Sequence, residues 1–398
     1  MKYYLAPHCA LKRLEEPCVY DAKQDELYGL DEQAFAYLAV AAELSGADPP
    51  EDSGFLSFCL AEGLLLTSPV CVTRPEPVQS PVPSLRYLEL QITTRCNLRC
   101  HHCYVGDPER TELSLDDLKR VLDEFQAMQG LRLLITGGEP LLHTQFREFN
   151  KMLPGYAFRK VLFTNGQVLD DTLLKSLAVD EIQISIDGLE KGHDALRGKG
   201  TFRKALDAAE RARRTGIPVS VATVVHRQNL DEFEGMSILF SGVGICDWTV
   251  DVPTPAGSFL QHPELLVPPE VAGRYLLYGF GGGIHGGGGG FACGLHLASV
   301  LASGDVCKCA FYAASPVGTL SGGLTHAWSS IRPVLLDELD CATDGCSVLG
   351  ECRGGCRYRA ERSAPENVPD YRKRCGRDFY KCHSYDIMKS RSRHEVCD

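Results

Sequence analysis

Six apolar runs that alternate with amphipathic helical segments restrict this chain of 398 residues to few architectures. The apolar runs cover residues 88–92, 131–136, 161–164, 182–186, 219–225 and 248–252. The helical patterns between them cover residues 114–129, 144–153, 171–177, 201–215 and 230–240. Alternating strands and helices predict a parallel sheet with helices outside it. The length fits an α/β fold, a partial (β/α)6 barrel, in which chemistry gathers at the carboxyl ends of the strands.

Three cysteines follow the first apolar run closely. They are Cys96, Cys100 and Cys103, and His101 and His102 stand between the last two. A four-iron cluster needs four ligands, so three thiolates would leave one iron open. A structural zinc site needs four closed ligands, and the two histidines could complete such a set. The spacing alone leaves both alternatives open.

The cysteine count is unusual for a chain of this kind. There are 18 cysteines, and more than half of them follow residue 290. The first four residues lack a signal-peptide pattern, and no apolar run approaches the length of about 20 residues that spans a membrane. We therefore expect a cytoplasmic protein, in which thiols ligate metals or clusters rather than form disulfides. A net charge of -11 argues against nucleic acid as a partner.

Further motifs stand at the ends of consecutive predicted strands. They are Gly-Gly-Glu-Pro at 137–140, Thr-Asn-Gly at 164–166, Ser-Ile-Asp-Gly at 185–188 and Arg-Gly-Lys-Gly at 197–200. Together with the Cys-x3-Cys-x2-Cys motif and Tyr104, they resemble the radical S-adenosylmethionine (SAM) superfamily over about residues 88–255. The resemblance implies a [4Fe-4S] cluster on Cys96, Cys100 and Cys103. The open iron would chelate SAM, and reduction would cleave SAM to a 5′-deoxyadenosyl radical.

The same resemblance implies which residues contact SAM. Two adjacent glycines allow close backbone approach, and a glutamate can accept a hydrogen bond from an ammonium group. The residues expected to bind the cofactor are Tyr104, Gly137, Gly138, Glu139, Pro140, Ser185, Asp187 and Arg197. Among them, Ser185 and Asp187 would contact the ribose and the carboxylate, and Arg197 would meet the carboxylate of SAM.

The C-terminal cysteines resemble the SPASM extension of this superfamily. Cys293, Gly304 and Cys309 match its first block around a predicted hairpin at 300–306, and Cys346, Cys352, Cys356 and Cys375 match its second block. One expected cysteine is replaced by Thr343, with Cys341 two residues earlier. By resemblance, Cys293, Cys309 and Cys356 would hold a nearer auxiliary cluster, and Cys341, Cys346, Cys352 and Cys375 a farther one. The eighth ligand would be Cys307, Cys382 or a substrate group, and a zinc ribbon is the alternative for the second block.

Basic residues surround the last of these cysteines. They are Arg372, Lys373, Arg374, Arg377 and Lys381. An acidic ferredoxin or flavodoxin could dock on them and exchange electrons with an exposed cluster. A plain solvated charge run is the alternative.

Residues 1–70 predict a small winged-helix-like α+β domain. Strands are expected at 3–14, 18–21 and 26–30, followed by a helix at 32–44 that Asp31 can cap and a second helix at 54–63. This segment resembles the peptide-binding domain of pyrroloquinoline quinone biosynthesis, which implies that a precursor's leader adds as a strand to an open sheet edge. A domain that merely packs on the barrel is the alternative.

The remaining divisions of the chain follow from composition. Residues 71–87 read as a proline-rich linker, 88–255 as the barrel, 256–292 as a bridging region and 293–398 as the cluster domain. The glycine-rich tract at 279–290 is a linker or a loop over the active site. We expect a maturase that installs a thioether, a carbon–carbon bond or an oxidation in a precursor peptide. The alternatives are a tetrapyrrole side-chain decarboxylase and a protein oxidase of the sulfatase-maturating type.

Overall fold

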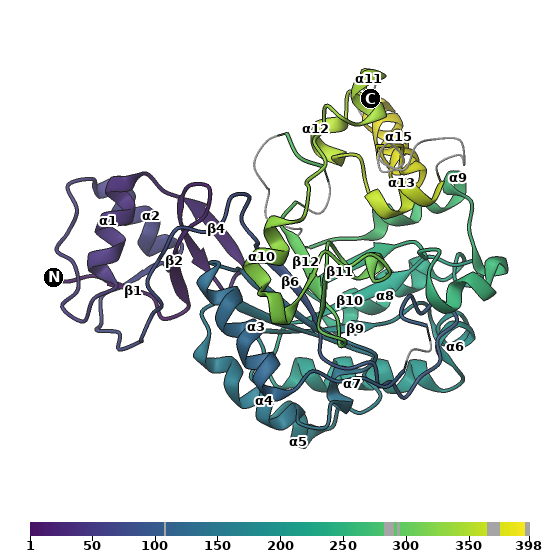
Figure 1. Cartoon of the computed structure of the whole chain (residues 1–398), viewed down its shortest axis with the longest axis horizontal. Helices are drawn as coiled ribbons and strands as arrows, with labels where there is room; N and C mark the ends of the chain where they lie inside the picture. Colours follow the sequence, from purple (N-terminus) through teal and green to yellow (C-terminus); the bar gives the residue numbers. More distant parts are fainter. Residues whose placement is uncertain (107–108, 282–289, 293–294, 364–374, 395–398) are drawn as a thin grey trace.

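A nine-stranded sheet, in the order β11-β10-β9-β8-β7-β6-β12-β13-β14, forms the centre of the molecule (Figure 1). The computed structural model describes residues 1–106, 109–281, 290–292, 295–363 and 375–394. Strands β6 to β11 follow one another in the chain and pair in parallel. Their bounds are β6 Tyr87–Gln91, β7 Arg132–Thr136, β8 Arg159–Thr164, β9 Glu181–Ser185, β10 Val219–Val224 and β11 Asp247–Asp251. The predicted partial barrel is confirmed, and every strand lies within two residues of its expected bounds.

Helices cover the outer face of this sheet (Figure 1). They are α3 Leu115–Ala127, α4 Phe146–Met152, α5 Asp171–Leu174, α6 Glu190–Arg197, α7 Thr201–Arg214 and α8 Phe233–Val243. Helix α3 begins as predicted, since the Ser114 side chain accepts a hydrogen bond from the Asp117 N–H. Helix α6 was not predicted, because its eight residues offer only Ala195 and Leu196 as apolar side chains. No helix in the described ranges is both long and apolar enough to cross a membrane.

A strand from far along the chain joins the first strand of the barrel. Strand β12, Leu297–Val300, pairs in parallel with β6. It also pairs antiparallel with β13, Asp305–Cys307, which in turn pairs with β14, Gly318–Thr319. This is the hairpin that the Gly304-Asp305 turn predicts, and Gly304 adopts a φ of +86° there. The C-terminal region is therefore built onto the edge of the barrel sheet.

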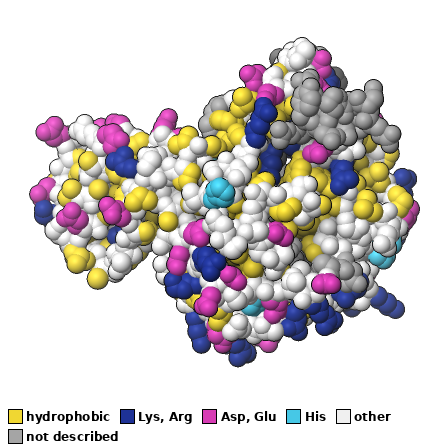
Figure 2. Space-filling view, in the orientation of Figure 1, with side chains coloured by type: hydrophobic (Ala, Val, Ile, Leu, Met, Phe, Trp, Pro, Cys, Tyr) yellow, Lys and Arg dark blue, Asp and Glu magenta, His cyan; other side chains and the backbone are white. Residues whose placement is uncertain are grey.

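Further helices complete the C-terminal part, and α11, α12, α13 and α15 lie above the barrel in Figure 1. Their bounds are α9 Pro269–Ala272, α10 Leu324–Ser329, α11 Asp340–Thr343, α12 Leu349–Cys352, α13 Arg357–Ser363 and α15 Phe379–His394. Within the described ranges, α15 contacts α9 and α12. The space-filling view shows a hollow between these helices and the barrel, bordered by hydrophobic and basic side chains (Figure 2).

The first 66 residues form a separate small module at the left of Figure 1. Strands β2 Cys9–Arg13, β3 Pro17–Asp21 and β4 Glu26–Gly29 form an antiparallel sheet, and β1 Tyr4–Leu5 pairs with β5 Leu65–Leu66. Helices α1 Glu32–Ala41 and α2 Ser53–Ala61 pack on them, and Asp31 caps α1 as predicted. The single strand expected at 3–14 was wrong. A turn at Pro7 and His8 divides it between two sheets, because proline lacks the N–H that a continuous ladder requires.

The module docks on the amino ends of the barrel strands. Asp25, in the β3–β4 turn, forms ion pairs with Arg132 and Arg159, which begin β7 and β8. The buried Lys12 donates to the Gly130 carbonyl at 3.0 Å. The three-cysteine loop follows the carboxyl end of β6. The module and the cysteine loop therefore lie at opposite ends of the parallel sheet.

Candidate active site

Cys96, Cys100 and Cys103 surround one cavity at the carboxyl ends of the barrel strands. The cavity measures about 680 Å³, and residues from every barrel strand or the loop after it line it, including Thr136, Thr164, Ser185, Ala222 and Asp251. Its polar and apolar lining is mixed, with Phe163 and Phe311 beside Gln183 and Arg197. The parallel topology thus brings side chains that are distant in sequence into one site, as expected for a barrel of this type.

Two glycines fix the loop that carries Cys96. Gly138 N–H donates to the Thr93 carbonyl at 2.8 Å, and Glu139 N–H donates to the Arg95 carbonyl at 2.7 Å. A Cβ at Gly138 would lie 2.5 Å from the Arg95 carbonyl oxygen, and a Cβ at Gly137 would meet the Thr93 carbonyl. Glycine is therefore required for the end of β7 to approach the chain just before Cys96.

The carboxylate of Glu139, predicted to contact SAM, lies between the ends of two strands in this structure. Its side chain is fully buried and accepts hydrogen bonds from the Thr164 hydroxyl at 2.9 and 3.0 Å and from the Asn165 N–H at 2.8 Å. Burial raises its pKa to about 7, although these donors act in the opposite direction. Neither Glu139 nor the buried Pro140 is among the residues that line the cavity. In this structure Glu139 ties the ends of β7 and β8 together.

Asp187 and Arg197 form a buried ion pair beside the cysteines. Asp187 is fully buried and holds the Arg197 guanidinium, and its other oxygen accepts from the Val224 N–H at 2.7 Å. Arg197 lines the cavity, with a guanidinium nitrogen 4.0 Å from the Cys100 sulfur. Asp187 itself does not line the cavity. The structure thus pairs these two predicted cofactor residues with each other, and their contact with SAM stays a prediction.

His102, which the sequence offers as a zinc ligand, completes this cluster. Its Nε2 lies 3.3 Å from an Arg197 nitrogen, and its buried Nδ1 has no hydrogen-bond partner among the described residues. Burial lowers the pKa of His102 to about 3, so the ring is neutral and can accept from the guanidinium. The neighbouring His101 points elsewhere and stacks on His262 at 4.2 Å between ring centroids.

Polar groups point toward the cysteine sulfurs. The Leu98 N–H donates to the Cys96 sulfur at 3.4 Å, and the Asn165 side-chain amide lies 3.9 Å from it. Burial raises the pKa of the Cys100 thiol to about 11, against the lowering effect of Arg197. Metal ligation requires the thiolate, so binding must release this proton.

The donor set fits a cluster better than a single ion. Only one group of three His, Cys, Asp or Glu side chains in the described ranges has ligand atoms within 4.8 Å of one another, and it lies elsewhere, at His8. The three cysteine sulfurs do not all lie within this distance of one another, yet they share the wall of one cavity. The cavity also contains the polar Ser185 and Arg197 that a SAM molecule would need.

A series of aromatic rings leads from this loop to the C-terminal region. Tyr104 packs edge-to-face on Phe311 at 5.2 Å, and Phe311 lies 5.7 Å from Tyr358. Tyr104 also donates to Glu89 at 3.3 Å. Each ring stands one or two residues from a cysteine: Cys103, Cys309 or Cys356. Packed rings therefore connect the loop of Cys103 with the segments that carry Cys309 and Cys356.

The structure places the C-terminal cysteines unequally. Burial raises the pKa of the Cys352 thiol, and the nearby Cys341 and Cys346 raise it further. Burial also raises the pKa of Cys382 to about 11, with added effects from Cys341 and Cys352. Cys341 therefore acts electrostatically on both Cys352 and Cys382. Cys375 is buried, and its carbonyl accepts a hydrogen bond from the Asp340 N–H at 3.0 Å.

Other expected residues lie apart or outside the described ranges. Cys307 is buried in β13, where Asp305 and Glu89 are the charged groups that affect it. The expected ligand Cys293, the basic residues Arg372, Lys373 and Arg374, and most of the glycine-rich tract lie outside the described residues. Arg377 is described and forms an ion pair with Asp344.

Sequence reasoning missed Glu89, which lines the cavity from β6. It accepts hydrogen bonds from the Ser299 hydroxyl at 2.6 Å and the Tyr104 hydroxyl at 3.3 Å, and burial raises its pKa. A single carboxylate within an otherwise apolar run, Leu88-Glu89-Leu90, was the available signal, because such a residue is rarely buried without a partner.

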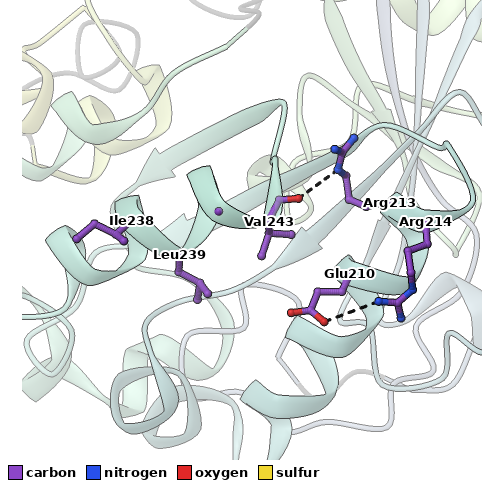
Figure 3. Close-up of a pocket in the computed structure, with 7 residues that line it drawn as sticks. Glu210, Arg213, Arg214, Ile238, Leu239 and Val243 are labelled. Atoms are coloured by element: carbon purple, nitrogen blue, oxygen red, sulfur yellow. Dashed lines mark hydrogen bonds and ion pairs between the residues drawn. The ribbon is translucent and has the colours of Figure 1, made fainter.

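A second depression lies on the outside of the barrel, between α7 and α8 (Figure 3). It measures about 640 Å³. At its rim, Arg213 donates a hydrogen bond to the Val243 carbonyl, and Arg214 forms an ion pair with Glu210. Its residues belong to the outer helices, away from the strand ends and the cysteines. We therefore place the candidate active site at the three-cysteine cavity.

Residues 90–237 match the family described as the radical SAM superfamily. The AdoMet-dependent heme synthase of Oleidesulfovibrio alaskensis is 28% identical over 49% of this chain and 53% of that protein. The chain thus spans about half the length of this relative. The mycofactocin maturase MftC of Mycolicibacterium smegmatis is 28% identical over 68% of this chain and 77% of that protein.

Among solved structures, the chain resembles Streptococcus suis SuiB bound to its precursor peptide SuiA. The TM-score is 0.67 at 13% identity, over 90% of this chain and 97% of SuiB. At this identity the likeness concerns the fold, and it extends over nearly the whole of both chains.

Proposed function

We propose that this chain, whose residues 90–237 belong to the radical SAM superfamily, is a maturase that modifies a ribosomally made precursor peptide. The product would be a thioether or carbon–carbon cross-link, or an oxidised residue. The observation that carries the proposal is the pairing of a three-cysteine cavity with an N-terminal module docked on the same barrel. SAM bound at a four-iron cluster supplies a 5′-deoxyadenosyl radical that abstracts a hydrogen atom.

The residues around the cavity would divide the work of holding these groups. Cys96, Cys100 and Cys103 would ligate the cluster. Arg197, oriented by Asp187, would receive the carboxylate of SAM. Gly137 and Gly138 would keep the Cys96 loop against the end of β7, and Ser185 would offer a hydroxyl from β9. Tyr104 would pack against the bound cofactor from the loop.

The module at residues 1–70 would recognise the leader of the peptide. Strand β4 is the outer strand of its sheet, and no further strand pairs with it in the described ranges. Because Leu30 N–H donates to the Pro17 carbonyl, the alternation of antiparallel pairs turns the N–H and C=O of Leu27 and Gly29 outward. Tyr28 packs edge-to-face on the half-exposed Phe58 of α2. A backbone edge beside an exposed aromatic side chain suits an added peptide strand.

The opposite placement of module and cavity sets a requirement on the substrate. Strand β6 has five residues, which corresponds to about 17 Å at about 3.3 Å per residue. A peptide held at β4 must span at least this length to reach the cysteines. The modified residue would therefore follow the leader contact by about five or more extended residues.

The comparisons support a peptide substrate over a tetrapyrrole. SuiB, which was solved with a precursor peptide, resembles the chain over 90% of its length, whereas the heme synthase matches about half. MftC, which is named a maturase, matches over two thirds. A tetrapyrrole decarboxylase or a sulfatase-maturating oxidase would leave the N-terminal module without a purpose. Because of the heme synthase match, the tetrapyrrole decarboxylase is the second candidate.

Residues 293–398 would hold auxiliary clusters. For the nearer cluster we keep Cys293, Cys309 and Cys356 as ligands. For the farther one we keep Cys341, Cys346, Cys352 and Cys375, and the electrostatic effect of Cys341 and Cys352 on Cys382 supports Cys382 over Cys307 as an additional ligand. A ferredoxin or flavodoxin would supply electrons at the basic residues near Cys375. These reduced thiols suit a cytoplasmic protein.

The central test is the formation of 5′-deoxyadenosine. The reconstituted chain, given SAM and dithionite, should produce it, and a variant with Cys96, Cys100 and Cys103 all replaced by Ala should not. Continued cleavage of SAM in that variant would show that the three cysteines do not form the active site.

A second experiment tests the peptide. Short peptides encoded beside the gene should bind the full chain, and the Gly29→Pro variant should bind at least about tenfold more weakly, because proline removes one outward N–H. The same variant should still form 5′-deoxyadenosine. Equal binding by both proteins would contradict recognition at β4, and no binding by either protein would argue for the tetrapyrrole alternative.

A further inference from the structure

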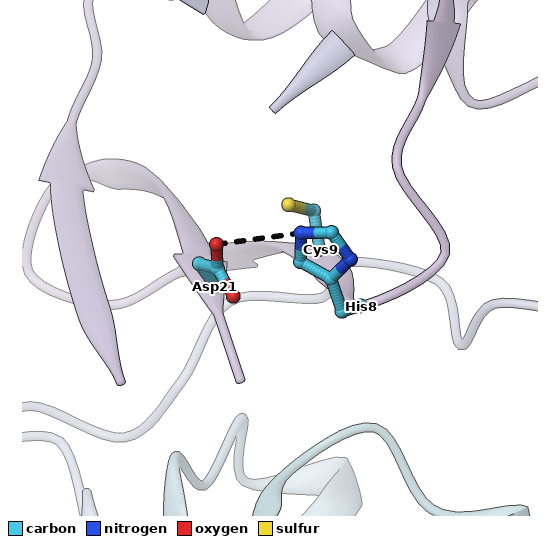
Figure 4. A group of neighbouring side chains, drawn as sticks. All are labelled: His8, Cys9 and Asp21. Carbon is cyan, nitrogen blue, oxygen red and sulfur yellow. Dashed lines mark ion pairs between the residues drawn. The ribbon is translucent and has the colours of Figure 1, made fainter. Parts of the chain in front are cut away.

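His8, Cys9 and Asp21 converge at one end of the β2–β3 hairpin (Figure 4). One imidazole nitrogen, the thiol sulfur and one carboxylate oxygen lie within 4.8 Å of one another. Cys9 and Asp21 are directly opposite each other in the two strands. His8 brings its Nε2 to 3.4 Å from the Asp21 Oδ2. Neither the radical chemistry nor the proposed peptide strand uses this group.

The two oxygens of Asp21 are treated differently. Oδ1 accepts hydrogen bonds from the Lys23 N–H at 2.8 Å and the Gln24 N–H at 3.0 Å, which closes the turn after β3. Within the described residues Oδ2 is buried and accepts no hydrogen bond, and its contact with His8 Nε2 at 3.4 Å is an ion pair only when the imidazole is protonated. A buried carboxylate oxygen without a hydrogen-bond donor is costly. A cation held between Oδ2, a neutral imidazole and the thiolate would remove that cost.

The donor types are those that zinc selects. Sulfur, imidazole nitrogen and carboxylate oxygen are its usual ligands, and three protein ligands leave a fourth position open. A thiolate and a carboxylate together neutralise the two charges of the ion. The nearest guanidinium, that of Arg74, is directed at the carbonyls of Leu5, Ala6 and Cys9, so it does not occupy the position between the three ligands.

We propose that His8, Cys9 and Asp21 bind one zinc ion, with water in the fourth position. His8 and Cys9 border a cavity of about 220 Å³ that residues of the module, Val72 to Pro75 and the barrel also line. This cavity gives the ion an entry path and room for water.

The ion would fasten the contact between module and barrel. Asp21 begins the turn whose Asp25 pairs with Arg132. Fixing the Asp21 carboxylate on both sides therefore fixes the docking turn. This role is independent of the radical reaction, so it stands or falls separately from the proposed function.

The test uses the full chain with its clusters reconstituted, incubated with zinc chloride and desalted. Zinc content is measured by elemental analysis, and zinc K-edge absorption reports the ligands. We expect about one zinc per chain more in the wild type than in His8→Ala or Cys9→Ser. The site should show one sulfur at about 2.3 Å and nitrogen or oxygen ligands at about 2.0–2.2 Å.

The matched control is Cys18→Ser, which removes another buried cysteine from the same sheet and should keep the zinc. A sulfur-only zinc spectrum would place the metal in the cluster cysteines and overturn the proposal, as would equal zinc in wild type and His8→Ala. His8 is partly exposed, so its replacement should not prevent folding. As an independent readout, zinc should slow hydrogen exchange of residues 21–25 in the wild type and not in His8→Ala.

Discussion

Asp187 is fully buried, and its carboxylate holds the Arg197 guanidinium against the wall of the three-cysteine cavity. One residue thus provides the charge that orients another. Loss of this ion pair should lower both the stability of the folded chain and its affinity for SAM, because both depend on the contact between Asp187 and Arg197.

Replacing Asp187 by Asn should leave the Arg197 charge buried without its partner. Removing one member of a buried pair costs about 3–5 kcal/mol, so the urea midpoint should fall and the dissociation constant for SAM should rise by at least about tenfold. The control is Glu190→Gln in α6, the helix that carries Arg197, since Glu190 forms an exposed pair with Arg203. That variant should change stability by less than about 1 kcal/mol. Equal effects of the two substitutions would contradict the role given to Asp187.

Gly138→Ala should displace the loop that carries Cys96. The added methyl would lie 2.5 Å from the Arg95 carbonyl oxygen and 2.6 Å from that of Thr94, so the backbone must shift. We expect iron retained per chain after reconstitution to fall by at least half, measured by elemental analysis. Gly155→Ala is the control, because nothing lies within 4 Å of its Cβ position. Full iron content in Gly138→Ala would show that the loop tolerates the shift.

Glu15 should make the docking of the module sensitive to acid. Burial raises its pKa, but the Ser84 N–H at 2.7 Å and the Arg86 guanidinium outweigh burial and lower the pKa from 4.5 to about 2. A carboxylate with a lowered pKa stabilises the folded state above pH 4.5, and this stabilisation is lost as the pH falls toward 2. The difference in urea midpoint between wild type and Glu15→Gln should therefore be larger at pH 6 than at pH 3.5.

For this comparison Glu16→Gln is the control, since Glu16 is an exposed neighbour. The cluster-free chain should be used for all three proteins, because acid removes iron. A difference that stays constant between pH 6 and pH 3.5 would rule out the Glu15 contact as its source.

Asp25→Asn should loosen the module from the barrel. Arg132 and Arg159 would lose a charged partner, and Tyr20 donates to the same carboxylate at 2.5 Å. Hydrogen bonds to charged groups contribute about 1.5–3 kcal/mol each. The lower free energy of unfolding should be detected by urea denaturation and, separately, by faster hydrogen exchange in residues 9–29. Asp48→Asn removes an exposed partner of Lys2 and should change stability by about 0.5 kcal/mol or less. Similar behaviour of both variants would mean that Asp25 does not hold the interface.

The hydrophobic periodicity of the chain predicted the barrel because the barrel strands are apolar runs, and the segments between most of them have clear amphipathic helical patterns. Helix α6 escaped, since a short helix stabilised by Asp187–Arg197 and by its neighbours has little pattern of its own. The first strand was drawn too long because apolar residues continue through Pro7, while the turn there depends on which sheet each half joins. Local sequence carries no signal for that choice.

The site was predictable where one loop carries the chemistry and less so where the fold brings residues together. Cys96, Cys100 and Cys103 lie within eight consecutive residues, so their Cys-x3-Cys-x2-Cys spacing is evident in the sequence. The contact of His102 with Arg197 depends on the angle between α6 and the cysteine loop, and Phe311 reaches Tyr104 from a segment more than 200 residues away. Glu139 was assigned by motif to the cofactor, but its burial between two strand ends is a property of the packed sheet.

The pairing of β12 with β6 has a consequence for synthesis on the ribosome. The first barrel strand ends at Gln91, but its partner on one side does not emerge until Val300 has been translated. For some 200 residues of elongation, one edge of β6 has no neighbour, and an unpaired apolar edge can capture other chains. Nascent chains truncated between β11 and β12 should therefore aggregate or engage chaperones, while chains that extend past the β12–β13 hairpin should be released.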